Sequence, residues 1–415
     1  MNTHATSTPS APSGPLTGYR VLELGSTAAG PFCARLLADF GAEVIKVEAQ
    51  EGDTIRELGH TVQGKSLYAA SILRNKRIIS LNLRTPKGRE ILTQLIPGFD
   101  IVVENFRPGT LEKWGLSYET LTRLRPELVL TRVSGFGQTG PYSARPGYGV
   151  IGEAMSGLRH LIGDADRPPS RVAMPLTDYI TGLYAALGTV MAVLARERTG
   201  KGQYVDASLL ESAFSFMEAH VPAFEKTGEI GMRSGPKLAN SAPNTLFPTR
   251  DGTWIHIAAL ADAVFRRLTT AMGRPELGTD PRFALQAPRN QNEAELERMI
   301  TDWTMAHDAA ELKAKLEAAE VPATTIYTVA DIFQDPHFKE RDMLVPTPDD
   351  DLGSVTLAGV VPKLSATPGR IRWSGHRLGQ DTREVLRELA GLTDSELDAL
   401  QAEGVISCDP QKALR

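Results

Sequence analysis

Residues 21–48 read VLELGSTAAGPFCARLLADFGAEVIKVE, and this stretch decides the fold class. The apolar runs 21–24 and 44–47 predict two strands. Between them lie four apolar residues at the spacing of one helix face: Cys33, Leu36, Leu37 and Phe40. A strand, an amphipathic helix and a second strand form a β-α-β unit, so the stretch predicts parallel pairing.

The alternation continues downstream with predicted strands at 78–83, 101–104 and 128–133 and predicted helices at 86–96 and 118–124. Strands separated by helices indicate a parallel sheet covered on both faces. Ligands of such sheets bind beyond the carboxyl ends of the strands. We therefore predict an α/β protein with a Rossmann-like large domain.

The pattern changes after about residue 225. Two short apolar runs at 245–248 and 254–259 flank Asp251-Gly252 and predict a hairpin, and Ala-, Glu- and Leu-rich helices follow. We expect a smaller α+β domain here. Beyond residue 335 a β-rich stretch and a final helix follow.

Composition limits the classes of function. The 415 residues are 41% hydrophobic with a net charge of −5, so no basic surplus favours nucleic acid or an anionic membrane. Cys33 and Cys408 are too few for a disulfide framework, which favours a reducing, cytoplasmic location. The apolar run 179–195 is interrupted by Gly and Thr, and we expect a buried core helix rather than a membrane span. Residues 1–14 have no apolar core and are not a secretory signal.

The turn 25–31 leads from a strand into a helix, where backbone N–H groups can face a phosphate. It lacks the G-x-G-x-x-G spacing of a dinucleotide site, although Glu48 ends the second strand where a ribose-binding acid can stand. NAD binding and a simple packing turn both remain open on this evidence.

The run 104–109, ENFRPG, ends another strand with an amide, an aromatic ring and a cation. It suits an adenine ring and its phosphates, but also an ordinary strand-to-turn junction. Further cations precede or follow the strands and could meet a phosphate or solvent alone: Lys46, Arg56, Arg74, Lys76 and Arg77.

Asp178 stands immediately before the long apolar run. Asp is a favoured N-cap of helices, which alone explains its position. The same N–H groups and the helix dipole would stabilise an ionised carboxylate that can act as a nucleophile. We find no spaced His, Cys or acidic set for a metal, no G-x-S-x-G and no Walker A loop.

Several of these motifs together resemble the class III coenzyme A transferases of the CaiB/BaiF type. The resemblance is carried by residues 21–48, Gly52-Asp53, 75–77, 104–109, 135–141, 199–203, 251–254 and 378–382. It covers nearly the whole chain apart from the N-terminal tail.

The resemblance implies a large domain made of both ends of the chain and an interlocked homodimer. The implied division is a disordered tail (1–15), the N-terminal part of the large domain (16–224), the small domain (225–335) and the return to the large domain (336–415). CoA and acyl-CoA would be substrates, with no tightly bound cofactor.

The family's catalytic aspartate falls on Asp178, which would form an acyl anhydride and then an aspartyl-CoA thioester. Oxyanion donors are expected at Gly137 and Gln138 and in a loop containing Gly235. The implied CoA contacts are Asn105 and Phe106 near the adenine, Lys46, and less directly Lys113 and Arg77. Succinyl-CoA is the expected donor, and a small carboxylic or dicarboxylic acid the acceptor.

Two alternatives come from the same resemblance. α-Methylacyl-CoA racemases place a histidine where this chain has Tyr148, and a tyrosine does not easily replace a near-neutral base. A CoA-binding module without turnover would not need Asp178. Ala28, Ala49 and Ser134 replace a glutamine and basic residues of some members, which disfavours formyl-CoA:oxalate transfer.

Overall fold

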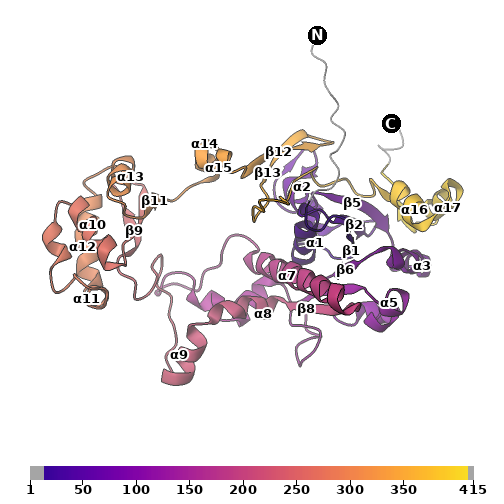
Figure 1. Cartoon of the computed structure of the whole chain (residues 1–415), viewed down its shortest axis with the longest axis horizontal. Coiled ribbons are helices and arrows are strands. Elements are labelled where there is room, and N and C mark those ends of the chain that lie inside the picture. Colours follow the sequence, from indigo (N-terminus) through magenta and orange to yellow (C-terminus); the bar gives the residue numbers. More distant parts are fainter. Residues whose placement is uncertain (1–13, 410–415) are drawn as a thin grey trace, which may run out of the picture. The chain divides into compact units, whose positions relative to one another are not determined.

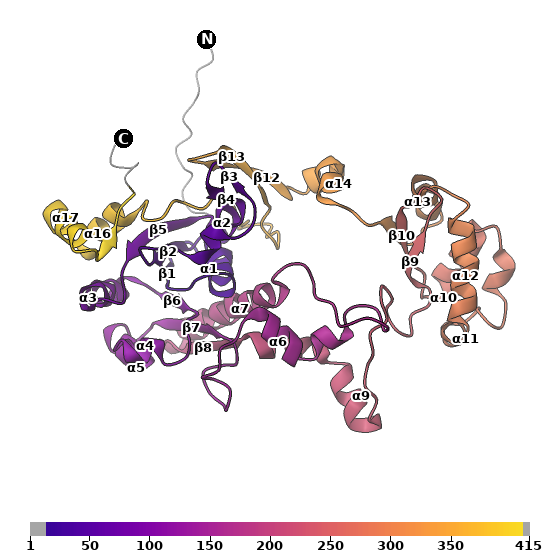
Figure 2. The ribbon, with the colours of Figure 1, turned by 180° about the vertical axis from the view of Figure 1, so that it is seen from behind.

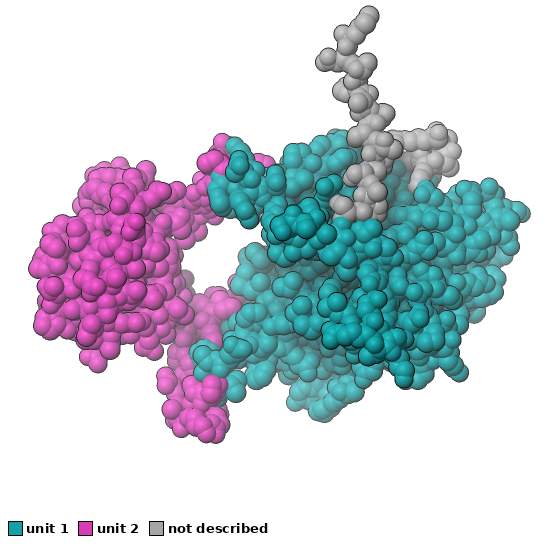
Figure 3. Space-filling view, viewed as in Figure 1, with its two compact units in different colours: residues 1–158, 172–221, 337–415 teal, residues 159–171, 222–336 magenta. Residues whose placement is uncertain are grey.

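The computed structural model describes residues 14–409 and divides into two compact units (Figure 3). Unit 1 contains residues 14–158, 172–221 and 337–409, and unit 2 contains residues 159–171 and 222–336. The predicted tail lies outside the described residues except for 14 and 15.

Unit 1 is built on a seven-stranded sheet in the order β14-β5-β2-β1-β6-β7-β8 (Figure 1). Its strands are β1 (Arg20–Glu23), β2 (Glu43–Glu48), β5 (Lys76–Leu81), β6 (Ile101–Glu104), β7 (Val129–Ser134), β8 (Tyr204–Ser208) and β14 (Ile406–Ser407). Six strands are parallel, and β14 pairs antiparallel with β5. Without β14, the strand order is that of doubly wound nucleotide-binding sheets. In these sheets the strands are added outward in one direction up to the third strand and in the other direction from the fourth, so the order reverses between the first and fourth strands. Here that switch point lies between β1 and β6.

Helices cover both faces of this sheet (Figure 2). They are α1 (Ala29–Asp39), α3 (Pro86–Leu95), α5 (Tyr118–Leu124), α7 (Leu176–Thr199), α8 (Leu209–Phe214), α16 (Thr382–Ala390) and α17 (Asp394–Ala402). Successive strand residues point to opposite faces. Val21 accordingly packs with α1 and α7, and Leu22 with α3, α5 and the C-terminal helices.

Shorter elements of unit 1 surround the carboxyl edge and one end of the sheet. They are α2 (Leu67–Ile72), α4 (Thr110–Lys113), α6 (Gly149–Met155) and the hairpins β3 (Thr61–Val62) with β4 (Lys65–Ser66) and β12 (Leu344–Asp349) with β13 (Gly353–Ala358). α9 (His220–Thr227) and α15 (Pro336–Glu340) lie where the chain passes between units.

Unit 2 has its own core around a three-stranded antiparallel sheet of β9 (Asn244–Pro248), β10 (Trp254–Ala258) and β11 (Ala323–Thr325). Its other helices are α10 (Asp262–Ala271), α11 (Gln286–Gln291), α12 (Glu293–Thr304), α13 (Ala309–Ala318) and α14 (Val329–Gln334). The segment 159–171 also belongs to this unit, because Arg233 donates to the His160 carbonyl and Gly235 N–H to the Gly163 carbonyl.

α7 differs from the expected buried core helix. One face packs on α1, β7 and β8, while the opposite face is exposed, including Leu183, Leu187 and Met191. By length and composition α7 could cross a membrane, but a core helix of a soluble protein passes the same test.

Candidate active site

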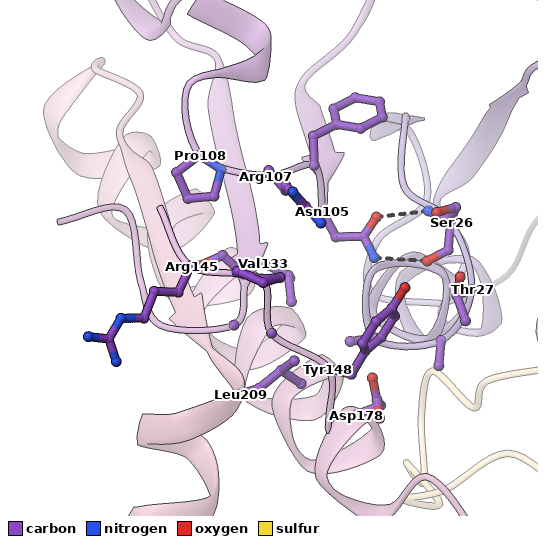
Figure 4. Close-up of a pocket in the computed structure, with 17 residues that line it drawn as sticks. Ser26, Thr27, Asn105, Arg107, Pro108, Val133, Arg145, Tyr148, Asp178 and Leu209 are labelled. Atoms are coloured by element: carbon purple, nitrogen blue, oxygen red, sulfur yellow. Dashed lines mark hydrogen bonds between the residues drawn. The ribbon is translucent and has the colours of Figure 1, made fainter. Parts of the chain in front are cut away.

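A cavity of about 240 Å³ lies at the carboxyl edge of the sheet beside the switch point (Figure 4). It is lined by residues 26–29, 105–108, 133–135, 145–148, 178 and 209. These residues follow β1, β6 and β7 or begin α7 and α8, so strands and helices far apart in sequence meet here. We call this space the first cavity.

Asn105 clamps the turn that follows β1. Its Oδ1 accepts from Ser26 N–H at 2.8 Å, and its Nδ2 donates to the Ser26 carbonyl at 2.8 Å (Figure 4). A Cβ on Gly25 would approach Asn105 Oδ1 to 2.9 Å, so glycine permits this contact. The Asn105 amide therefore stabilises the turn after β1. Its expected contact with adenine stays a prediction.

Asp178 lies inside the first turn of α7, as its third residue, and Pro175 occupies the cap position. The expectation of an N-cap immediately before the helix was wrong by three residues. The carboxylate still lies at the positive end of a 24-residue helix. It packs directly against Gly149 at the start of α6, where a Cβ would lie 2.0 Å from Asp178 Oδ2.

Three tyrosines surround this carboxylate. Tyr148 lies across it in Figure 4, between Asp178 and the Ser26–Asn105 pair. Behind it, Tyr179 Oη donates to Tyr68 Oη at 2.9 Å. Burial and this hydrogen bond raise the pKa of Tyr68, and the charge of Asp178 contributes in the same direction. Tyr68 is therefore a neutral phenol near a carboxylate.

A second cavity of about 370 Å³ adjoins the first and shares Ser26 and Phe106 with it. It is lined by residues 24–26, 46–49, 52–54, 81–84, 106, 110 and 114. Phe106 contacts Trp114 edge-to-face, with ring centroids 5.1 Å apart. The shared wall lets one long ligand occupy both spaces.

Lys46 is fully buried in the wall of the second cavity. Its Nζ lies 3.0 Å from Glu23 Oε1, 2.9 Å from Asp53 Oδ2 and 2.6 Å from the Gly25 carbonyl oxygen. The ammonium is enclosed by two carboxylates and a carbonyl within the fold, and its expected contact with CoA stays a prediction. Sequence alone could not distinguish this buried cation from a solvated one.

Arg77 lines neither of the two cavities. It is the second residue of β5, at the amino end of the strand, whereas both cavities lie at carboxyl ends. Its guanidinium pairs with Glu43, Glu384 and Glu388 at 3.0–3.2 Å. It therefore joins β2 to α16, and its expected contact with CoA stays a prediction. Lys113, by contrast, is exposed on α4, whose Thr110 lines the second cavity.

The predicted oxyanion donors belong to two different units. Gly137 and Gln138 follow β7 just beyond the lining residues, and Gln138 N–H donates to Asp206 Oδ2 at 2.8 Å. Gly235 belongs to unit 2, whereas every residue lining the first cavity belongs to unit 1. Their catalytic roles stay predictions.

A buried ion pair supports the ENFRPG segment. Glu104 Oε1 accepts from Arg132 Nε at 2.7 Å, and Oε2 accepts from Phe106 N–H at 2.7 Å. Burial raises the pKa of Glu104 to about 7, against the lowering effect of Arg132. Arg132 also bonds Glu112 of α4 at 2.8 Å, so this pair fixes α4 beside the second cavity.

Several lining residues escaped the sequence prediction: Thr27, Asn82, Arg84 and Arg145. Gly149, which packs against Asp178 without lining either cavity, escaped it as well. Arg84 and Asn82 follow β5, and the rule that ligands lie beyond strand ends could have found them. Gly149 carries no local signal. Among residues 14–409, no group of three or more His, Cys, Asp or Glu could hold a metal ion.

Comparison with known proteins agrees with this geometry. The model of CoA-transferase family III matches residues 16–382. Succinyl-CoA–D-citramalate CoA-transferase of Chloroflexus aurantiacus is 48% identical, covering 95% of this chain and 99% of its own. Succinate–glutarate CoA-transferase of Agrobacterium fabrum is 34% identical, covering 90% and 96% respectively.

Solved structures show the same fold. A CAIB/BAIF family protein from Brucella suis superposes with a TM-score of 0.82 at 35% identity, covering 91% of this chain and 100% of its own. The chain therefore belongs to CoA-transferase family III and is a CoA-transferase.

Proposed function

We propose that this enzyme moves CoA from succinyl-CoA to a small dicarboxylic acid through covalent intermediates on Asp178. Three relatives with 34–48% identity are named for succinyl-CoA or succinate with citramalate, malate or glutarate. The observation that carries the mechanism is the place of Asp178, at a helix N-terminus inside a cavity that adjoins a larger one.

The nucleotide end of CoA fits the second cavity, which is within the usual size range of small-molecule sites. Phe106 offers a ring face, and Arg84 and Lys113 offer cations for phosphate groups. The pantetheine arm then passes the wall of Ser26 and Phe106. This route delivers the thioester to the first cavity.

The chemistry begins when an Asp178 carboxylate oxygen attacks the donor thioester carbonyl. The carbon–sulfur bond breaks and CoA leaves as a thiolate. The succinyl group is then joined to Asp178 as a mixed anhydride. The thiolate attacks the Asp178 carbonyl of that anhydride, which releases succinate and forms an aspartyl-CoA thioester. The acceptor carboxylate attacks this thioester and expels the thiolate again. The thiolate then attacks the acceptor acyl carbonyl, which forms the product and restores Asp178.

Each addition places negative charge on a carbonyl oxygen near Asp178. The N-terminal turns of α6 and α7 both begin beside this carboxylate, so their dipoles favour that charge. Gly137, Gln138 and Gly235 are the further donors that we propose. No step needs an acid-base pair at the α-carbon, which distinguishes the reaction from racemisation.

We also propose that two chains form the expected interlocked homodimer. The outward face of α7 carries Leu183, Leu187, Met191 and Leu194, each about half exposed, at the spacing of one helix side. A continuous apolar stripe of this kind is typical of a protein–protein interface. A second copy is the partner that the family resemblance favours.

The test is a purified-enzyme exchange assay with succinyl-CoA and a panel of citramalate, malate, mesaconate and glutarate. Hydroxylamine added during turnover should convert Asp178 to the hydroxamate, detected by peptide mass spectrometry. Asp178→Ala should abolish both exchange and modification, whereas Asp302→Ala, which removes an exposed carboxylate in unit 2, should change neither. Exchange retained by Asp178→Ala would refute the mechanism, and solvent deuterium at the α-carbon would favour racemisation.

A further inference from the structure

Thr27 has a strained backbone at the wall of the first cavity. Its φ is 66°, in the left-handed region, although its side chain is β-branched. Such a conformation costs about 1–3 kcal/mol and persists only where neighbouring groups enforce it. Thr27 lines the cavity that contains Asp178, so whatever holds it also shapes the site.

Asp53 holds the Thr27 backbone in this conformation. Its Oδ1 accepts from Thr27 N–H at 2.8 Å and from Ile55 N–H at 3.0 Å. The hydroxyl of neighbouring Thr54 lies 3.0 Å from the Thr27 hydroxyl. The Asp53 side chain is only 1% exposed, so water does not compete for these bonds.

Two buried lysines connect Asp53 to the rest of the turn. Lys46 Nζ lies 2.9 Å from Asp53 Oδ2 and 2.6 Å from the Gly25 carbonyl oxygen. Lys76 Nζ lies 2.8 Å from the Pro31 carbonyl oxygen, and Glu23 bridges the two lysines. These two cations and two anions contact the backbone at the start, middle and end of the turn.

Stability alone does not explain this buried quartet of charges, which consists of Glu23, Lys46, Asp53 and Lys76. Desolvation of buried ions offsets much of their attraction, and well-packed apolar residues often stabilise a fold equally well. The proposed transfer steps use none of the four groups. A polar quartet that bonds three points of one turn fixes the geometry of that turn.

We infer that Asp53 is a positioning residue for CoA transfer, which acts by holding Thr27 against the first cavity. The inference rests on the proposed function, because it assumes chemistry at Asp178. Ala28 and Ala29 follow Thr27 in the cavity wall, so release of Thr27 would shift the surface that faces the reacting carbonyl. A displacement of about 1 Å near reacting atoms can cost about 100-fold in rate.

The test measures kcat, KM and amide hydrogen exchange in three Asp53 backgrounds. Asp53→Ala should lower kcat by about 30-fold and change KM for succinyl-CoA less, while the Thr27 amide exchanges at least about tenfold faster. Asp53→Asn retains a weaker acceptor and should fall between wild type and Asp53→Ala in both measurements. If Asp53→Ala does not fold, Asp53→Asn carries the comparison.

A double-mutant cycle separates positioning from general destabilisation. Glycine adopts positive φ without strain, so in a Thr27→Gly background the Asp53→Ala substitution should lower kcat by less than about fivefold. Asp39→Asn is the matched control: Asp39 is equally buried and pairs with Arg74 at the other end of α1. It should lower stability but leave kcat and Thr27 exchange within about twofold of wild type.

Three results would overturn the inference: kcat of a folded Asp53→Ala protein within about threefold of wild type, an Asp53 effect unchanged by Thr27→Gly, or an equal kcat loss in Asp39→Asn. Failure of the proposed function has a different signature, since wild type would then lack exchange or Asp178→Ala would retain it. Hydrogen exchange at the Thr27 amide needs no turnover, so it tests the hydrogen bond from Thr27 N–H to Asp53 in either case.

Discussion

Gly149 has no side chain, and the Asp178 carboxylate occupies the space where its Cβ would lie. Because a Cβ there would lie 2.0 Å from Asp178 Oδ2, Gly149→Ala must displace the nucleophile. We predict a fall in kcat of about 100-fold, with a small change in melting temperature, measured by succinyl-CoA exchange and calorimetry. Gly98→Ala is the control, because its Cβ would meet open space. Similar kcat values for the two variants would contradict this packing.

Asn105 gives a second prediction about a single residue. Asn105→Leu removes both hydrogen bonds to Ser26, whose backbone groups are exposed and can bond to water instead, so the loss should be about 0.5–1.5 kcal/mol per bond in urea unfolding. Asn105→Asp keeps the acceptor for Ser26 N–H and should lose less. An unchanged unfolding free energy together with weaker CoA binding would instead indicate a direct adenine contact.

These residues show what the sequence could predict about the site. Local sequence singled out Asp178 as a helix cap or a stabilised carboxylate, and only the family resemblance implied its catalytic role; α7 begins earlier than expected. The ion pairs of Lys46 could not be predicted, because its partners Glu23 and Asp53 come together only in the folded chain. Gly149 approaches Asp178 from another helix, so no local sequence pattern predicts this contact.

At the scale of elements, the β12–β13 hairpin is tied to β4 by Lys65 and Asp349, whose Nζ and Oδ2 atoms lie 2.8 Å apart. Burial opposes ionisation, but hydrogen bonds from Lys65, Ser374 and two backbone N–H groups lower the pKa of Asp349 to about 2. A carboxyl with a depressed folded pKa contributes stability above its unfolded pKa of 3.8 and loses it as pH falls toward 2.

Asp349→Asn should therefore lower the unfolding free energy by about 1–2 kcal/mol at pH 6 and by almost nothing at pH 2. Urea unfolding at several pH values measures this difference. Asp350→Asn is a neighbouring control, because Asp350 is exposed and outside the Lys65 pair. An equal penalty for Asp349→Asn at both pH values would contradict the ion pair.

The elements themselves were largely predictable where periodicity was strong. The predicted strand 101–104 and helix 118–124 match β6 and α5, and β1, β2 and β7 differ by one residue at their ends. β8 was missed because it is short and carries Asp206 amid apolar neighbours. β14 has two residues and pairs antiparallel with β5, a contact that connects positions more than 300 residues apart.

At the scale of the whole molecule, the resemblance implied a partner chain, and we propose that this partner covers the exposed face of α7. Helical periodicity predicted an apolar helix but could not show which side the chain itself covers. In unit 1 the small residues Ala185 and Ala186 face the sheet, while the larger Leu187 and Met191 face outward. Large apolar side chains left outside a completed core indicate a further surface to be covered.

We therefore predict that Leu187→Glu/Met191→Glu converts the protein to a monomer. Two charges on the outward face of α7 would have to be buried without partners in an interface, which costs several kcal/mol. Light scattering after gel filtration should give about twice 45.0 kDa for wild type and 45.0 kDa for the variant. Leu285→Glu is matched in exposure, at 59%, but lies in unit 2 before α11, and it should remain dimeric. A wild-type mass of 45.0 kDa at micromolar concentration would refute the homodimer, and a dimeric double variant would place the interface elsewhere.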